Sequence, residues 1–243
     1  MLKLIKDSWE TYKNNAKLVQ LFSIPFLISF LIPLLAPMPT YITGGAIFLR
    51  SASIFLNLNV VGLAAIVISL FLSLLFLSFA FVAISLIVKA KRTYTKHAES
   101  VIRGIEKYTA RVFVVLLAYA VVLVLANILS YSIGLENVIT PIVGFFFFMA
   151  IFYAPTAIVI ENKGICAALG KSLKLVAKEP QQFILWVVLI TAVISVLDFV
   201  AIAVTGTLIS RYVLLLINSL FVMPYFVIYQ AEAYMKRFSL LKH

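Results

Sequence analysis

The sequence is poor in the residues that build metal sites and disulfides. It has one cysteine, Cys166, and two histidines, His97 and His243. A single cysteine excludes an intrachain disulfide and a cysteine-based metal cluster, and two imidazoles argue against a metal site of another kind. The chain also has no Asn-x-Ser/Thr sequon. We therefore expect no bound metal and no cofactor.

Charge is equally scarce, because Asp, Glu, Lys and Arg make up only 12% of the 243 residues. Hydrophobic residues make up 64%, and the mean hydropathy is +1.13. A soluble domain needs more charge to cover its surface, so a soluble globule is excluded. The net charge of +11 fits basic residues that lie beside membrane spans and attract anionic lipid headgroups. We expect the bilayer as a partner and no nucleic acid.

Six long apolar runs account for most of the chain. Each is near or above the about 20 residues that cross about 30 Å of hydrocarbon. The sequence therefore predicts an all-α integral membrane protein with six transmembrane helices. The runs cover roughly residues 18 to 36, 60 to 88, 112 to 130, 138 to 160, 183 to 203 and 208 to 231.

The basic residues are distributed unevenly between the two sides of these runs. Eighteen of the twenty Lys and Arg residues lie near the ends of the chain or in alternate gaps, around residues 89 to 111 and 163 to 178. The other gaps hold only Arg50 and Arg211. Basic segments stay on the cytoplasmic side of a membrane. This predicts a multi-pass protein of the cell (plasma) membrane with both termini in the cytoplasm.

Three of the basic segments share a design in which an amphipathic helix leads into a pair of spans. This pattern predicts one membrane domain, 1–243, made of three repeats of about 1–95, 96–163 and 164–243. Aligning Trp9, Ile105 and Leu173 brings the three segments into register. We expect these side chains on equivalent buried faces of cytoplasmic interfacial helices, dipping into the headgroup boundary or packing on the bundle. The apolar stripes are Leu2, Ile5, Trp9, Tyr12, Ala16 and Val19; Val101, Ile102, Ile105, Tyr108 and Val112; and Ile165, Leu169, Leu173 and Val176.

One stretch, YAPTAIVIENKGICAALGKSLKLV, carries a resemblance to known proteins. It has a proline near the end of a span (Pro155), an acid before a glycine at a short turn (Glu161, Gly164) and a Lys-Ser pair (Lys171, Ser172). In these features it resembles uncharacterised six-span membrane proteins of prokaryotes, which are similar to the membrane domain of some bacterial glycerophosphodiester phosphodiesterases. The resemblance implies no catalysis, because the chemistry of those enzymes belongs to a separate soluble domain for which this chain has no room.

Asp198 is the one carboxylate inside an apolar run. Acidic residues within a membrane are costly and point to function unless they are paired. Arg211 begins the last run across a short turn, so a hairpin would bring it near Asp198. We favour a structural ion pair over a proton or cation site.

Two amides, Asn127 and Asn218, also fall inside apolar runs. Side chains of this kind join helices by hydrogen bonds more often than they bind ligands. The runs hold no two acids, no His with an acid and no Ser with a base at one depth, so we predict no catalytic residues. Glu161, Asn162 and Lys163 cluster at a turn, where helix capping is the favoured interpretation.

These features leave two classes of function open. The favoured class is a non-enzymatic membrane scaffold or partner-binding subunit, with a protein partner on the cytoplasmic face. The alternative is a transporter or channel for an ion, lipid or other small solute. A polar cavity that connects Asp198, Asn127 and Asn218 would favour the alternative.

Overall fold

The structure, a computed structural model, describes residues 2–36, 40–49, 59–93 and 97–237. Arg50 and Lys96, which belong to the charge pattern above, lie outside these residues. The elements are α1 (Leu2–Asn14), α2 (Ala16–Leu31), the 3₁₀ turn η1 (Ile32–Leu35), β1 (Thr40–Thr43), β2 (Ala46–Leu49), α3 (Val60–Thr93), α4 (His97–Tyr131), α5 (Glu136–Ile151), α6 (Ala154–Glu161), α7 (Ile165–Lys178), α8 (Pro180–Ile217), the π-helical turn η3 (Asn218–Val222) and α9 (Met223–Arg237).

The prediction of an all-α membrane fold with six spans is confirmed. Six helical stretches are long and apolar enough to cross a bilayer. They are Ala16–Leu35, Val60–Lys91, Gly104–Tyr131, Glu136–Glu161, Pro180–Gly206 and Ile209–Lys236. The only sheet in the described residues is the two-stranded hairpin of β1 and β2, which the sequence did not predict.

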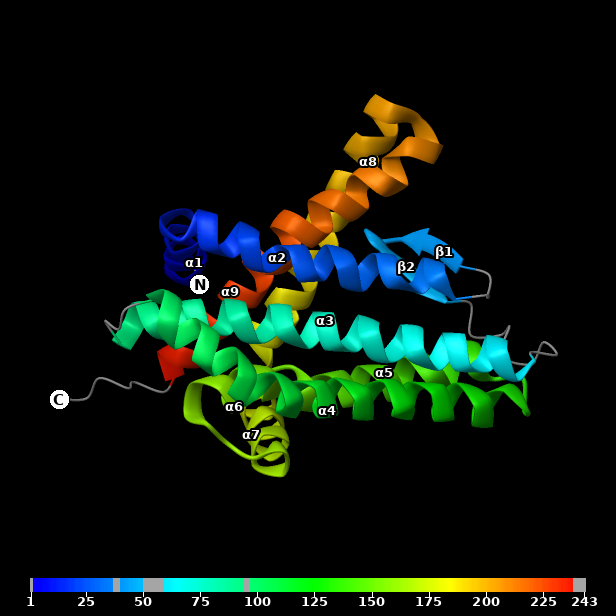
Figure 1. Cartoon of the computed structure of the whole chain (residues 1–243), viewed down its shortest axis with the longest axis horizontal. Coiled ribbons are helices and arrows are strands. Elements are labelled where there is room, and N and C mark those ends of the chain that lie inside the picture. Colours follow the sequence, from blue (N-terminus) through cyan, green and yellow to red (C-terminus); the bar gives the residue numbers. More distant parts are fainter. Residues whose placement is uncertain (1, 37–39, 50–58, 94–96, 238–243) are drawn as a thin grey trace.

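Helices α2, α3, α4 and α5 lie side by side and form the body of the molecule (Figure 1). One end of this body carries α1, α6, α7 and the last turns of α9, and we call it the basic end. The other end carries the β-hairpin and the turn between α4 and α5, and we call it the hairpin end (Figure 1).

Helix α8 departs from this arrangement and forms an arm that leaves the body and folds back on itself (Figure 1). The reversal lies at Gly206, whose φ of 76° is readily adopted only by glycine. In the apolar 18-residue window of the span Pro180–Gly206 only 6% of the residues are buried by protein, against 56% in the corresponding window of Glu136–Glu161. Most of the surface of the arm is therefore not covered by other parts of the described protein.

The packed core lies at the basic end, around α6 and α9. Residues 154–160 of α6 and 226–235 of α9 are all buried. Two prolines shape these helices. Pro155 follows the break between α5 and α6, and Pro224 follows η3, where the N–H of Met223 bonds to the carbonyl of Asn218 five residues earlier. The wide turn gives room to a residue that has no N–H and would clash with a regular helix.

The three amphipathic segments do not fold alike. Asn15 separates α1 from α2, and Glu179 and Pro180 separate α7 from α8. The segment around Ile105, however, is continuous with the span in α4. In this segment the amphipathic helix leads directly into its span, as the sequence pattern predicts, because no proline interrupts the helix before the apolar run.

The buried faces of α1 and α7 also differ from the predicted stripes. Ile105 is 9% exposed, as expected, but Trp9 is 52% and Leu173 is 46% exposed to the surroundings of the protein. The residues just before them, Ser8 and Ser172, are fully buried. Small side chains let helices approach closely inside a membrane protein. The prediction that Leu173 packs on the bundle was therefore wrong. Trp9, although half-exposed, packs edge to face on Tyr225 of α9 with ring centres 6.1 Å apart. Contact of both side chains with headgroups remains a prediction.

Candidate functional site

An apolar cavity of about 370 Å³ lies among the helices of the bundle. Its volume lies in the lower part of the about 300–1,000 Å³ range of ligand pockets. We call it the central cavity, and helices from most of the chain contribute to its wall. The lining residues are Phe30, Leu74, Leu77, Phe81, Leu116, Tyr119, Ala120, Leu123, Phe148, Ile151, Phe152, Pro155, Trp186, Met223, Phe226, Val227 and Gln230.

The few polar groups in this wall all bond to the protein itself. The hydroxyl of Tyr119 donates to the carbonyl of Gly144 at 3.3 Å, and the indole N–H of Trp186 donates to the carbonyl of Phe226 at 3.2 Å. The amide of Gln230 donates to the carbonyl of Phe152. Because these donors are occupied, the cavity presents an almost entirely hydrocarbon surface.

Aromatic rings make one part of the wall rigid. Phe152 packs edge to face against Phe183 and Trp186, with ring centres 5.0 and 5.1 Å apart. Trp186 packs in the same way on Phe226 at 5.6 Å. Such pairs stabilise a fixed arrangement beyond the burial of their area. The proline-associated breaks also border the cavity, since Pro155 and Met223 both line it.

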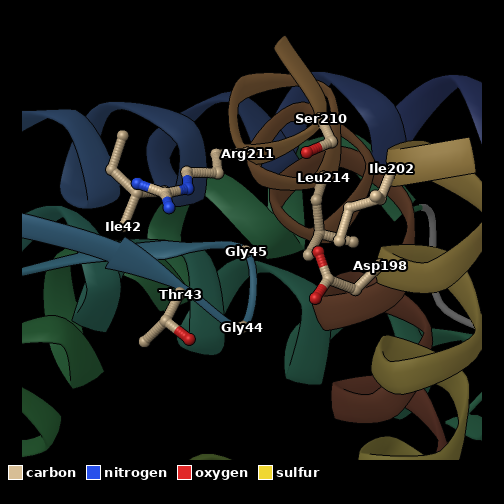
Figure 2. A pocket seen from close by; sticks show the side chains of 9 residues that line it. All are labelled: Ile42, Thr43, Gly44, Gly45, Asp198, Ile202, Ser210, Arg211 and Leu214. Atoms are coloured by element: carbon tan, nitrogen blue, oxygen red, sulfur yellow. The ribbon is translucent and has the colours of Figure 1, made fainter. Parts of the chain in front are cut away.

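A second, smaller pocket of about 210 Å³ lies at the hairpin end (Figure 2). We call it the hairpin pocket. It contains two of the residues singled out from the sequence, Asp198 and Arg211, which extend from the arm of α8. The other lining residues are Ile42, Thr43, Gly44, Gly45, Ile202, Ser210 and Leu214.

The predicted ion pair between Asp198 and Arg211 is not formed. Within the described ranges, the ion pairs are at the basic end and none involves either residue. The guanidinium of Arg211 extends over the hairpin toward Ile42, whereas the carboxylate of Asp198 points toward Gly44 (Figure 2). The reversal at Gly206 explains this correction. Asp198 lies eight residues before it, so its counterpart across the turn is Leu214, and Arg211 lies nearer the tip.

The two amides lie apart from Asp198 in separate environments. Asn218, in η3, donates from its side chain to the carbonyl of Gly45 at 3.0 Å and so anchors the β-hairpin to the last span. Asn127 lies in α4 and lines neither the central cavity nor the hairpin pocket. Neither the central cavity nor the hairpin pocket connects Asp198, Asn127 and Asn218.

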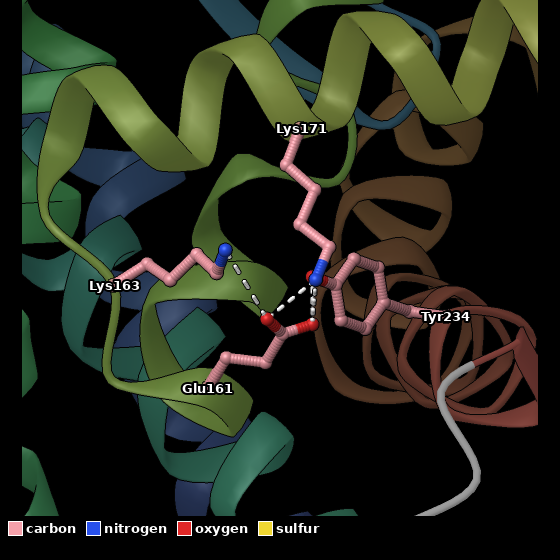
Figure 3. Close-up of polar contacts among 4 residues, drawn as sticks. All are labelled: Glu161, Lys163, Lys171 and Tyr234. Atoms are coloured by element: carbon pink, nitrogen blue, oxygen red, sulfur yellow. Dashed lines mark hydrogen bonds and ion pairs between the residues drawn. The ribbon is translucent and has the colours of Figure 1, made fainter.

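At the basic end, Glu161 joins three helices (Figure 3). Lys171 of α7 lies 2.5 Å from both of its carboxylate oxygens, and the hydroxyl of Tyr234 in α9 donates to one of them at 2.7 Å. Lys163 lies 3.6 Å away. Asn162 ends α6 in the left-handed conformation, with φ of 53°. This agrees with capping at the turn, and the cluster ties α6, α7 and α9 together.

A neighbouring contact joins the two ends of the chain, and the sequence analysis did not predict it. Glu232 in α9 is only 2% exposed and accepts a hydrogen bond from Thr11 of α1 at 2.8 Å. Lys91 of α3 donates to the same hydroxyl at 2.7 Å, and Lys236 pairs with Asp7 at 3.2 Å. Glu232 directly follows the last apolar run, which is the one signal that pointed to its burial.

The residues that bind metals in other proteins do not gather in this structure. In the part of the chain described here, no group of three His, Cys, Asp or Glu residues lies close enough to hold an ion. Comparison of the chain with family models, with curated proteins and with solved structures gives no match. The resemblance of residues 153–176 to phosphodiesterase membrane domains therefore stays a prediction.

Proposed function

We propose that the protein is a non-enzymatic membrane protein that binds the hydrocarbon chain of a lipid in its central cavity. The observation that carries the proposal is the cavity itself, about 370 Å³ of apolar space lined by the membrane-spanning helices. Of the two classes that the sequence left open, this favours the alternative, with a lipid as the bound molecule.

The chemistry of the wall supports an apolar ligand over an ion or a polar solute. A polar group that enters hydrocarbon without a hydrogen-bond partner costs about 2–7 kcal/mol. The Tyr119 hydroxyl, the Trp186 indole N–H and one N–H of Gln230 already donate to backbone carbonyls, so the wall has few polar groups left to compensate that cost. A lipid chain meets no such penalty, because it exchanges one hydrocarbon environment for another.

A route from the bilayer is consistent with the exposure of the lining residues. Phe30, Leu74 and Leu123 line the cavity and are half-buried, so the cavity is not sealed from its surroundings. The thinly covered arm of α8 also contributes to the wall through Trp186. Entry between helices, directly from the membrane, follows from this arrangement.

The experiment uses a phospholipid with a photoreactive diazirine in one acyl chain, incorporated with the full chain into nanodiscs. Illumination and peptide mapping should place cross-links on 116–123 of α4 and 223–227 of α9. Ala120→Phe fills part of the cavity and should reduce these cross-links. Ala118→Phe is the matched control, because Ala118 lies two residues away on the exposed side of α4.

Two results would contradict lipid-chain binding. The first is equal labelling of the cavity peptides in Ala120→Phe and Ala118→Phe. The second is labelling confined to outward-facing positions such as Phe199, which is 76% exposed. Thermal unfolding of both variants in detergent shows whether each is folded before the comparison is made.

A scaffold function with a cytoplasmic protein partner is the second candidate. Its support is the outward surface of α7, where Leu173, Lys174 and Cys166 are all exposed. A helix that presents an apolar and a basic residue side by side suits a headgroup layer or a partner. Leu173→Ser should then reduce association with the membrane surface or partner without a loss of cavity labelling.

The orientation is part of the same proposal, with the basic end in the cytoplasm of a cell bounded by its plasma membrane. The charge distribution supports it. Cys166 is exposed and is the one cysteine of the sequence, so it reports the side directly. A membrane-impermeant maleimide should label it in inside-out vesicles and not in intact cells, and labelling in intact cells would reverse the topology.

A further inference from the structure

The hairpin pocket is lined by one acidic and one basic side chain, and neither forms an ion pair within the described chain. Asp198 and Arg211 are the charged residues among the nine that line it, and no ion pair joins them. Asp198 is half-buried and Arg211 is exposed. An acid inside a membrane span is costly unless a positive charge or hydrogen-bond donors compensate it.

The two charges approach the pocket from different sides (Figure 2). The carboxylate of Asp198 points toward Gly44 from the first half of the arm, and the guanidinium of Arg211 reaches over β1 near Ile42 from the second half. The pocket between them has a volume of about 210 Å³, enough for one small polar group. A molecule placed there meets a negative charge at one end and a positive charge at the other.

We infer that the hairpin pocket binds a zwitterion in which an ammonium group and a phosphate group lie a few bonds apart. The ammonium pairs with Asp198, and the phosphate accepts hydrogen bonds from Arg211. A guanidinium suits this role because its planar set of donors matches the oxygens of a phosphate. The site is separate from the central cavity and does not depend on lipid-chain binding there.

The floor of the pocket is held in place by the β-hairpin. Gly44 and Gly45 have φ of 54° and 69°, and the carbonyl of Gly45 accepts the bond from Asn218. A Cβ on Gly44 would meet no atom within 4 Å, and Gly44 lines the pocket. This fixes the distance between hairpin and arm before any ligand arrives, which favours binding.

The zwitterion can be the headgroup of a phospholipid or a free small molecule, and the two differ in whether acyl chains are attached. A phospholipid headgroup would bring chains that lie along the arm, where Val196, Phe199 and Val204 are exposed. A free phosphoethanolamine-like compound would use the pocket alone. The chemistry of the two end groups is the same in both cases.

The experiment measures binding to the full chain in detergent by native mass spectrometry. The three probes are dihexanoyl phosphatidylethanolamine, which has both charges, dihexanoyl phosphatidylglycerol, which lacks the ammonium, and phosphoethanolamine, which lacks the chains. The ethanolamine lipid should bind at least about tenfold more tightly than the glycerol lipid, as expected for one lost charge-assisted contact. If phosphoethanolamine binds as tightly as the ethanolamine lipid, the ligand of the pocket is the free compound. If it binds much more weakly, the ligand is the lipid.

The variants separate the two charges. Asp198→Asn should abolish the preference for the ethanolamine lipid over the glycerol lipid, whereas Arg211→Gln should weaken both by about tenfold. Glu136→Gln is the control, because it removes a carboxylate at the same end of the molecule but outside the pocket. Thr43→Trp fills the pocket from an exposed position without changing a charge, and it should block binding even if a charge variant folds poorly.

Equal binding of the two lipids to the wild-type chain would overturn the inference. So would binding of the ethanolamine lipid that survives Asp198→Asn, Arg211→Gln and Thr43→Trp unchanged.

Discussion

The basic end and the hairpin end treat their charged residues in opposite ways. At the basic end, Glu161 is bonded to Lys171 and Tyr234, and Glu232 is bonded to Thr11. At the hairpin end, Asp198 and Arg211 share a pocket without an ion pair between them. Both ends therefore contain an acid near a base, but only the basic end joins them.

This difference identifies the charged residues that stabilise the fold. The bonds of Glu161 and Glu232 connect helices that are far apart in the sequence, and they lie where α6 and α9 are most deeply buried. The charges of the hairpin pocket connect nothing directly. Loss of a charge should therefore affect stability at the basic end and ligand binding at the hairpin end.

The largest expected effect follows from removing the carboxylate at the basic end. Glu161→Gln leaves the ammonium of Lys171 without its partner, and hydrogen bonds to charged groups contribute about 1.5–3 kcal/mol. We expect a loss of about 2–3 kcal/mol in the free energy of unfolding, measured by denaturation in detergent. Asp198→Asn should change it by less than about 0.5 kcal/mol. Equal losses in the two variants would abolish the contrast between the ends.

A double-mutant cycle sharpens the same comparison. Glu161→Gln combined with Lys171→Met should cost less than the sum of the two single changes, because each single change strands the other group. Asp198→Asn combined with Arg211→Gln should be additive, because no direct bond joins that pair. Strict additivity at the basic end, or a coupling at the hairpin end, would contradict the structure.

The attachment of the β-hairpin is tested by two neighbouring glycines. Both Gly44 and Gly45 have positive φ, so alanine is strained at either position. A Cβ at Gly45 would lie 2.6 Å from the Cβ of the buried Asn218, whereas one at Gly44 meets nothing within 4 Å. Gly45→Ala should cost about 2 kcal/mol more than Gly44→Ala and should expose the hairpin to hydrogen exchange. Similar exchange in the two variants would show that the hairpin is not fixed by this contact.

Two buried serines provide a smaller contrast within the basic end. Ser172 accepts from the N–H of Tyr153 at 2.9 Å and so bridges α7 to the start of α6. Ser8 donates only to the carbonyl of Leu4 within its own helix. Ser172→Ala should cost about 1–2 kcal/mol and Ser8→Ala less than about 0.5 kcal/mol, by thermal unfolding in detergent. The reverse order would contradict the assigned contacts.

The smallest expected effect concerns Tyr12, whose buried hydroxyl has no hydrogen-bond partner among the described residues. Tyr12→Phe should leave stability at neutral pH within about 0.5 kcal/mol of the wild type. Burial raises the pKa of the Tyr12 phenol above its ordinary value of 10.0. The unfolded chain therefore loses this proton first as the pH rises above 10, and the folded wild type loses stability there. The phenylalanine variant lacks this loss, so an unchanged difference between the two proteins from pH 8 to 11 would contradict the burial.

The sequence by itself determined the number and approximate limits of the spans. Each apolar run meets the length requirement of the bilayer without help from any other part of the chain. It did not show that α1 and α7 are separate from the spans that follow, where Asn15 and the Glu179-Pro180 pair interrupt the helix.

Only the tertiary structure decided which faces of these helices are buried. In a membrane protein, lipid and protein interior are both apolar, so hydrophobicity does not distinguish Leu173, which faces outward, from residues that pack. Ser8 and Ser172 occupy the packed faces because they are small. Glu232 is buried because Thr11, 221 residues earlier, lies against it.

The hairpin end shows the same limit for the candidate site. The sequence identified Asp198, Arg211 and Asn218 as unusual, because a polar residue inside an apolar run can be recognised from the sequence alone. Whether Asp198 pairs with Arg211 depended on the position of the reversal at Gly206, which places Leu214 opposite the carboxylate. The central cavity was invisible for a related reason, because its wall combines ordinary apolar side chains from helices that meet only in the folded protein.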